Sequence, residues 1–208
     1  MKLYGYWRSS ATWRLRIALN WKGLAYETVP VHLVRREQHS DEHLARNPMA
    51  QVPVLELEDG TVLSQSLPII EYLEGQHPEP ALLPDAAIAR AQVRAMAEVV
   101  NAGIQPIQNF RVLMDLVELG VDKKAWGAMV IDRGLRALEV MAKPLAGRFL
   151  YGDALSMADL CLIPQLYNAR RFGVDLTELE TLCRVEQYCQ ALPAFIQAHP
   201  DAQIDAQR

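Results

Sequence analysis

Hydrophobic and polar positions divide the chain into two parts with different periodicity. In the first 80 residues, short apolar runs alternate with stretches of helical spacing. From residue 85 onward, apolar residues recur almost throughout at intervals of three and four, which is typical of amphipathic helices. The pattern therefore predicts an α/β domain over residues 1–80 and an all-α domain over residues 85–208, joined by a proline-rich linker at 77–80.

The first part predicts the element order βαβαββα. Its strands are expected where aromatic and β-branched residues cluster, at Leu3–Trp7, Tyr26–Val31, Val52–Leu57 and Val62–Leu63. Its helices are expected to start near Ala11, Asp41 and Ser66, with Ser40 or Asp41 capping the second and Ser66 capping the third. The first strand, helix and strand form a unit that implies a right-handed parallel crossover.

Capping residues and helix breakers mark the second part. Asp85 and Asp122 each precede a helical pattern and are expected to cap it. Ser156 and Asp159 have the spacing of a capping box at the start of a strongly apolar helix, which Gly173 should end. No strand is predicted in this part.

Composition and charge narrow the class of protein. Half of the 208 residues are hydrophobic and 22% are charged, with a net charge of -4, so neither nucleic acid nor an anionic membrane is an expected partner. The cysteines are Cys161, Cys183 and Cys189, too few for a disulfide framework, and we expect a cytoplasmic protein. His39 and His43 have i, i+4 spacing in a polar segment expected to be mobile, and no metal site is predicted there.

The junction between the first strand and the first helix carries the candidate chemistry. Ser9 and Ser10 lie where a helix needs hydroxyls to bind its free N–H groups. The same place favours anions, because the helix dipole and the free amides both point toward it. Two interpretations follow: the serines only cap the helix, or one of their hydroxyls holds a bound thiolate.

Several motifs along the chain match those of a known family. In the first part they are Trp7-Arg8-Ser9-Ser10, Trp13-Arg14, Arg16-Ile17-Ala18-Leu19, Asn47-Pro48-Met49, Gln51-Val52-Pro53 and Leu63-Ser64-Gln65-Ser66. In the second part they are Ile104–Asn109, Met157–Leu162 and Asn168–Phe172. In this order, they resemble the zeta class of glutathione transferases, which includes the maleylacetoacetate and maleylpyruvate isomerases. The chain departs from the zeta signature at Ala11, where the family usually has a cysteine, and this departure excludes a glutaredoxin-like reaction.

The resemblance implies a thioredoxin-like domain followed by the helical domain of the glutathione transferase fold, with glutathione as cofactor. It implies that Ser9, or else Ser10, holds the glutathione thiolate. The other implied glutathione contacts are the backbone of Val52, Gln65 and Ser66 for the γ-glutamyl end, Gln38 and His39 for the glycyl end, and Gln105 and Asn109 from the second domain.

The substrate implied by the resemblance is a dicarboxylate with a cis double bond conjugated to a ketone. Arginine binds carboxylates bidentately, and Arg8, Arg111 and Arg171 are the candidates for this substrate. Arg8 is also counted with Ser9 and Ser10 as catalytic. The resemblance further implies a homodimer that acts in aromatic amino acid catabolism.

Two other functions remain open at this point. The chain could be a glutathione transferase that acts on other small electrophiles, such as α-halo acids. It could also be a glutathione-binding module that lost its chemistry together with the cysteine at position 11.

Overall fold

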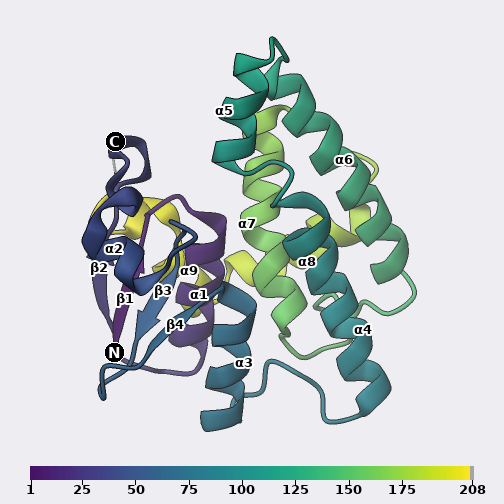
Figure 1. Ribbon diagram of the computed structural model, residues 1–208. Coiled ribbons are helices and arrows are strands. Elements are labelled where there is room, and N and C mark those ends of the chain that lie inside the picture. The colour runs from purple at the N-terminus through teal and green to yellow at the C-terminus, as the bar shows by residue number, and fades with distance from the viewer. Residues whose placement is uncertain (207–208) are drawn as a thin grey trace. The chain divides into compact units, whose positions relative to one another are not determined.

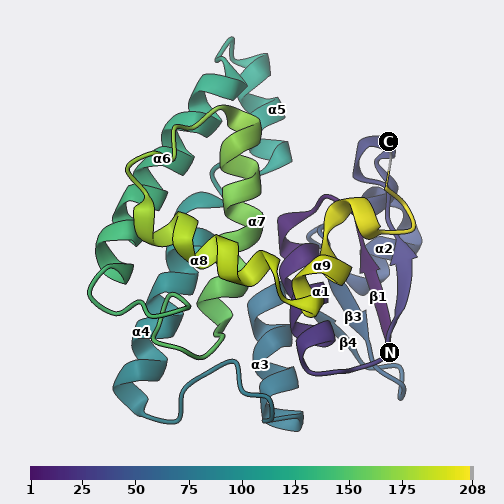
Figure 2. The same cartoon turned by 180° about the vertical axis from the view of Figure 1, so that it is seen from behind.

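The computed structural model describes residues 1–206 and divides into two compact units (Figure 1). The first unit comprises residues 1–82 and the C-terminal segment from Ala191, and the second comprises residues 83–190. We expected residues 85–208 to form one domain, but the contacts of the described segment 191–206 group it with the first unit. The physical reason is that the helix at Pro193–Ala198, α9, packs against α1, Ser10–Trp21 (Figure 2).

The first unit contains a four-stranded mixed sheet with the strand order β2-β1-β3-β4. The strands are β1 Lys2–Gly5, β2 Glu27–Pro30, β3 Val54–Glu56 and β4 Val62–Ser64. The helices after α1 are α2 Asp41–Arg46 and α3 Ser66–Gln76, with two 3-10 turns at Leu33–Arg35 and Glu37–His39. Strand β1 runs parallel to β2 and antiparallel to β3, so the predicted order βαβαββα is confirmed.

Alternation along β1 assigns the two faces of the sheet. Tyr4 packs with Val31 and Val54 in a buried cluster. The guanidinium of Arg46, in α2, lies 4.2 Å from the centre of the Tyr4 ring. Gly5 points the other way, toward α1, because a Cβ at this residue would lie 2.3 Å from Cγ2 of Thr12. The absence of a side chain at position 5 therefore lets α1 approach the sheet closely.

The second unit is helical. Its helices are α4 Ala87–Glu98, α5 Phe110–Glu118, α6 Lys123–Ala142, α7 Met157–Phe172 and α8 Glu180–Gln190, with a π-helical turn at Val99–Ile104. Helix α7 contacts α4, α6 and α8 and carries the core (Figure 2). The structure also corrects one cap: Ala86, not Asp85, is the N-cap of α4, and its side chain cannot bond the free amides.

The predicted capping box at the start of α7 is present and buried. The Asp159 carboxylate accepts hydrogen bonds of 2.8 Å from the backbone N–H and the hydroxyl of Ser156, and from the N–H of Leu150. Gly173 ends the helix with φ 77°, as the sequence predicts. Among the helices of residues 1–206, none combines the length and the apolar character needed to cross a bilayer.

Candidate active site

Ser9 is the N-cap of α1. Its Oγ accepts a hydrogen bond from the backbone N–H of Thr12 at 3.3 Å, and Ser10 is the first residue of the helix. No acidic residue lies in the first turn, so no carboxylate of α1 itself offsets the positive end of its dipole. A hydroxyl that accepts a bond from an N–H still has its own proton to donate. Capping and thiolate binding are therefore compatible roles for one serine.

The loop before β3 presents an unpaired peptide. The Val52–Pro53 bond is cis, and no backbone hydrogen bond of Val52 occurs within residues 1–206. The preceding carbonyl, that of Gln51, lies 3.0 Å from Nε2 of His43 and accepts a 2.9 Å bond from Nδ2 of Asn47. The free N–H and C=O of Val52 can thus pair with the backbone of a bound peptide.

The start of α3 differs from the prediction. Gln65, not Ser66, is the N-cap, and Ser66 is the buried first residue of the helix. The reason is the turn after Ser64 in β4: Gln65 adopts φ 69° to redirect the chain from strand to helix. The first turn contains no acidic residue, so this N-terminus is available to a carboxylate.

The register of the sheet brings these segments to one edge. Tyr4 pairs with Val54, and Val54 pairs with Ser64. The segment after β1, the loop before β3 and the segment after β4 therefore leave the sheet at the same edge. A side-chain bond joins two of them directly, from Nε2 of Gln65 to Oε1 of Gln51 at 3.4 Å.

This edge fits a thiol-containing peptide with a carboxylate. It offers a hydroxyl at the N-terminus of one helix, an unpaired peptide group at Val52, and the N-terminus of a second helix. The chemistry of this donor set matches the thiol, the cysteinyl peptide and the γ-glutamyl carboxylate of glutathione. The residues that the structure brings together here are Ser9, Ser10, Val52, Gln65 and Ser66.

Four predicted contact residues belong to the second unit: Gln105, Asn109, Arg111 and Arg171. Asn109 is the N-cap of α5 and accepts a 3.0 Å bond from the N–H of Arg111, which leaves its amide group to donate. Nε2 of Gln105 lies 3.4 Å from Oε1 of Gln165. Arg171, in the last turn of α7, is exposed and donates to Oδ1 of Asn168 at 3.2 Å.

Comparison with known proteins identifies this arrangement. The sequence model described as the N-terminal domain of glutathione S-transferase matches residues 3–81, and the one described as the C-terminal domain matches residues 85–191. The chain belongs to the glutathione S-transferase family. The fold predicted from the sequence is confirmed by these matches.

Individual relatives of this glutathione S-transferase fall in the predicted class. It is 43% identical to the maleylacetoacetate isomerase of Dictyostelium discoideum, with 99% of this chain and 95% of the relative covered. It superposes with a TM-score of 0.96 on a maleylpyruvate isomerase described as a bacterial zeta-class enzyme, at 45% identity with both chains fully covered. It superposes with a TM-score of 0.92 on the maleylacetoacetate isomerase of Anaeromyxobacter dehalogenans with bound glutathione, at 54% identity over 99% of this chain and 97% of that one. The Anaeromyxobacter protein is also solved with bound dicarboxyethyl glutathione and citrate.

Gln38 and His39 of this glutathione S-transferase differ sharply in their surroundings. Both lie in the 3-10 turn Glu37–His39, where Gln38 is buried and His39 is exposed. Oε1 of Gln38 is buried and has no hydrogen-bond partner within the described residues. A buried amide oxygen without a donor costs free energy, so this atom is suited to accept a bond from a bound ligand.

The sequence reasoning missed the residues that hold the Val52 loop. His43 was expected in a mobile polar segment, but it is buried because its ring reaches the carbonyl of Gln51. Asn47 holds the same carbonyl and also accepts a 3.1 Å bond from the N–H of Met49. The available signal was Asn47-Pro48, a dipeptide typical of turns.

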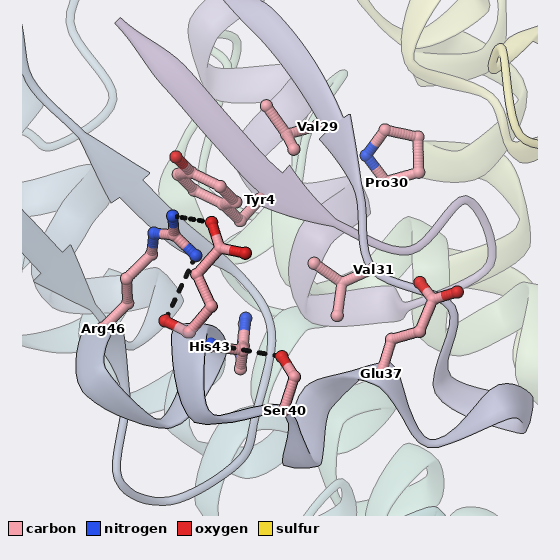
Figure 3. Close-up of a pocket in the computed structure, with 9 residues that line it drawn as sticks. Tyr4, Val29, Pro30, Val31, Glu37, Ser40, His43 and Arg46 are labelled. Carbon is pink, nitrogen blue, oxygen red and sulfur yellow. Dashed lines mark hydrogen bonds and ion pairs between the residues drawn. The ribbon is translucent and has the colours of Figure 1, made fainter.

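A separate pocket of about 260 Å³ lies beside α2 (Figure 3). It contains none of the candidate site residues, and its lining is Tyr4, Val29, Pro30, Val31, Glu37, Ser40, Glu42, His43 and Arg46. Its charged groups are already paired: Arg46 lies 2.6 Å from Glu42, and Glu37 accepts from the N–H of His32. The hydroxyl of Tyr4 donates to Glu56 at 2.8 Å, and burial raises the pKa of this phenol. The pocket therefore shows no chemistry of its own.

Proposed function

We propose that this chain is a glutathione-dependent cis–trans isomerase of a maleyl keto dicarboxylate, either maleylacetoacetate or maleylpyruvate. The enzyme class predicted from the sequence is confirmed by relatives with these names, aligned over nearly the whole chain. The observation that carries the proposal is the single sheet edge that brings together a capping hydroxyl, an unpaired peptide and a second free helix N-terminus. The relatives do not favour α-halo acid chemistry or a non-catalytic role.

Glutathione, when bound, would supply a thiolate that adds to the double bond; rotation about the resulting single bond and loss of the same thiolate would then leave the trans product. The γ-glutamyl carboxylate would lie at the start of α3, near Gln65 and Ser66, and the cysteinyl peptide would pair with Val52. Oε1 of Gln38 would accept a hydrogen bond from the glycyl end of glutathione, and His39 would lie beside it at the surface. Gln105 and Asn109 would add contacts from the second unit.

Ser9 stabilises the charged form of the thiol. The pKa of a free cysteine-like thiol is about 8.5, so at neutral pH most of it is protonated. The Ser9 hydroxyl would donate its proton while Oγ accepts from Thr12, and the dipole of α1 favours the same negative charge. Ser10 and its N–H line the same site. Both effects lower the thiol pKa without a protein cysteine, so Ala11 does not prevent the reaction.

Arginines bind the two substrate carboxylates in this proposal. Arg8 precedes Ser9 in the sequence, and its guanidinium lies 5.0 Å from the centre of the Trp7 ring. Arg111 and Arg171 are exposed and carry the positive charge that the second unit contributes. The malonate bound with glutathione in the Methylobacterium relative, a dicarboxylate, and the citrate in the Anaeromyxobacter relative, a tricarboxylate, support a site for small anions with several carboxylates.

The test is a spectrophotometric assay of the purified chain with each maleyl substrate, with and without glutathione. Turnover of at least one substrate, only when glutathione is present, is the expected result. An α-halo acid assayed in parallel is the matched alternative. Turnover of the halo acid with none of either maleyl substrate would replace the isomerase by a different transferase reaction.

The setting of the enzyme is part of the proposal. We place it in the cytoplasm as a homodimer, in the degradation of aromatic amino acids. The names of the relatives support the pathway, and the zeta-class resemblance supports the dimer. Sedimentation equilibrium of the purified chain measures the dimer directly.

A further inference from the structure

The peptide groups of Trp7 are held on both sides by charged side chains. Its N–H donates to Oδ2 of Asp205 at 3.0 Å, and its carbonyl accepts from Nη2 of Arg16 at 2.8 Å. Strand β1 ends at Gly5, so the sheet ladder does not supply these bonds. The path of the chain from β1 to Ser9 is therefore set in part by two side chains.

Arg16 links this path to the C-terminal segment. It is 1% exposed, and its Nε donates to the carbonyl of Ala198, the last residue of α9, at 3.1 Å. Burial lowers the pKa of Arg16 to about 10, so the group remains charged at neutral pH. A buried charge is costly unless hydrogen bonds compensate it, and here they come from two carbonyls far apart in sequence.

The C-terminal segment is itself fixed in place. Nε2 of Gln203 donates to the carbonyls of Gln197 and His199, both at 2.9 Å. The His199 ring packs edge-on against Trp13 of α1, with the ring centres 5.2 Å apart. Figure 2 shows α9 against α1, followed by the last turn of the chain. This ordered segment gives the Asp205 carboxylate a defined position.

The carboxylate of Asp205 is directed at the junction. Oδ2 binds Trp7, and Oδ1 is buried without a hydrogen-bond partner among the described residues. Within the described residues, the Asp205 side chain thus makes no hydrogen bond to its own C-terminal segment. Its hydrogen bond with the N–H of Trp7 lies two residues before the helix cap Ser9.

We propose that Asp205 and Arg16 are positioning residues for the Ser9 hydroxyl, and that the C-terminal segment is thereby part of the active site's support. The inference rests on the proposed function, because it concerns the serine that holds the thiolate. Hydrogen bonds to a thiolate weaken when the donor shifts or tilts, and a misplacement of about 1 Å can cost up to 10²-fold in rate.

The test compares Asp205→Ala with Asp201→Ala in the full chain. Asp201 is the matched control, because its exposed carboxylate lies 3.6 Å from His199 and does not contact Trp7. Three quantities are measured: kcat at saturating glutathione, KM for glutathione, and the pKa of the bound thiol from the pH dependence of thiolate absorbance. We expect Asp205→Ala to lower kcat by about tenfold and to raise the thiol pKa above that of Asp205→Asn, which removes the same charge but keeps the acceptor, whereas Asp201→Ala matches the wild type.

Asp205→Asn and Asp205→Glu separate positioning from folding. Asn retains an oxygen that accepts from Trp7 and should recover most of the rate. Glu moves the acceptor by one methylene and should give an intermediate thiol pKa. If Asp205→Ala does not fold, these two variants alone carry the test.

Two failures are distinguishable. An active wild type together with unchanged kcat and thiol pKa in the Asp205 variants overturns this inference and leaves the isomerase proposal intact. A wild type that turns over neither maleyl substrate overturns the proposed function, and the inference falls with it.

Discussion

The imidazole Nε2 of His43 lies 3.0 Å from the carbonyl oxygen of Gln51, so a side chain of α2 holds the loop that presents Val52. Asn47 donates to the same oxygen at 2.9 Å. Ala50, next to Gln51, has φ 53°, a conformation that most residues avoid. The loop therefore depends on these two bonds to keep an unfavourable backbone in place.

Removal of either bond should weaken glutathione binding. We expect His43→Ala and Asn47→Ala each to raise the Kd for glutathione by about five- to tenfold, the equivalent of about 1 kcal/mol for one hydrogen bond. Titration calorimetry measures the change, with His77→Ala, an exposed linker histidine, as the control. Wild-type affinity in both loop variants would show that Val52 does not need this support.

Substitutions at Ser9 should separate its two roles. Ser9→Ala removes both the cap and the proton donor, so we expect a loss of about 1 kcal/mol in unfolding free energy and a bound-thiol pKa raised by about 1–2 units. Ser9→Asp retains a capping acceptor but places a negative charge beside the thiolate. It should therefore be as stable as the wild type and still fail to form the thiolate.

Ser10→Ala is the matched control for Ser9, because Ser10 lies one residue later in the first turn of α1. Urea unfolding and the pH dependence of thiolate absorbance are measured on all four proteins. A larger effect at position 10 than at position 9 would move the thiolate donor to Ser10.

Asp159 should make stability depend on pH in an unusual direction. Burial raises its pKa to about 6, although hydrogen bonds from Leu150 and Ser156 favour the charged form. Because the folded chain binds this proton more tightly than the unfolded chain, the contribution of Asp159 is largest below about pH 4 and falls as the pH rises to about 6. The difference in unfolding free energy between wild type and Asp159→Asn should therefore shrink across this range.

Urea unfolding at closely spaced pH values measures that difference. Asp115→Asn, at an exposed position of α5, is the control. A gap that stays constant or widens from pH 4 to about 6 would show that the hydrogen bonds outweigh burial at Asp159.

The buried ion pair between Lys22 and Glu74 should be a major source of stability in the first unit. Nζ of Lys22 lies 2.7 Å from Oε2 of Glu74 and also donates to the carbonyls of His77 and Pro80. Glu74 in turn accepts from the N–H of Leu82. Lys22→Met should cost about 3–5 kcal/mol, because it leaves a carboxylate buried without its cation.

The double variant Lys22→Met with Glu74→Leu should recover part of that loss, since it removes the unpaired charge. Arg148→Ala provides the comparison, because Arg148 and Asp153 form a pair whose side chains are 61% and 70% exposed. Denaturant unfolding gives each value. If Lys22→Met and Arg148→Ala lower the free energy of unfolding equally, the buried Lys22–Glu74 pair contributes no more to stability than an exposed pair.

The sequence predicts the order of elements well because the signals are local. The apolar runs of the strands and the capping box at Ser156 each act within a few residues, and the structure contains both. The predicted N-cap of α3, Ser66, is wrong by one residue. The N-cap is Gln65, because the position of β4 imposes a left-handed turn there and overrides the preference of serine for caps.

The parts that the sequence did not predict depend on distant contacts. Arg14 and Arg16 are fully buried in α1, although arginine is normally exposed, and Arg16 owes this to carbonyls at Trp7 and Ala198. The assignment of residues 191–206 to the helical domain failed for the same reason. No local pattern indicates a partner 182 positions away.

The grouping of residues 191–206 with the first unit also sets an order of events during synthesis. A chain leaves the ribosome from its N-terminus, so the sheet and α1 emerge long before Ala198 and Asp205 are made. Until then, the buried guanidinium of Arg16 lacks one of its carbonyls and the N–H of Trp7 lacks its acceptor. The Ser9 junction can therefore gain these two contacts only after Ala198 and Asp205 have been made and have folded back onto the first unit.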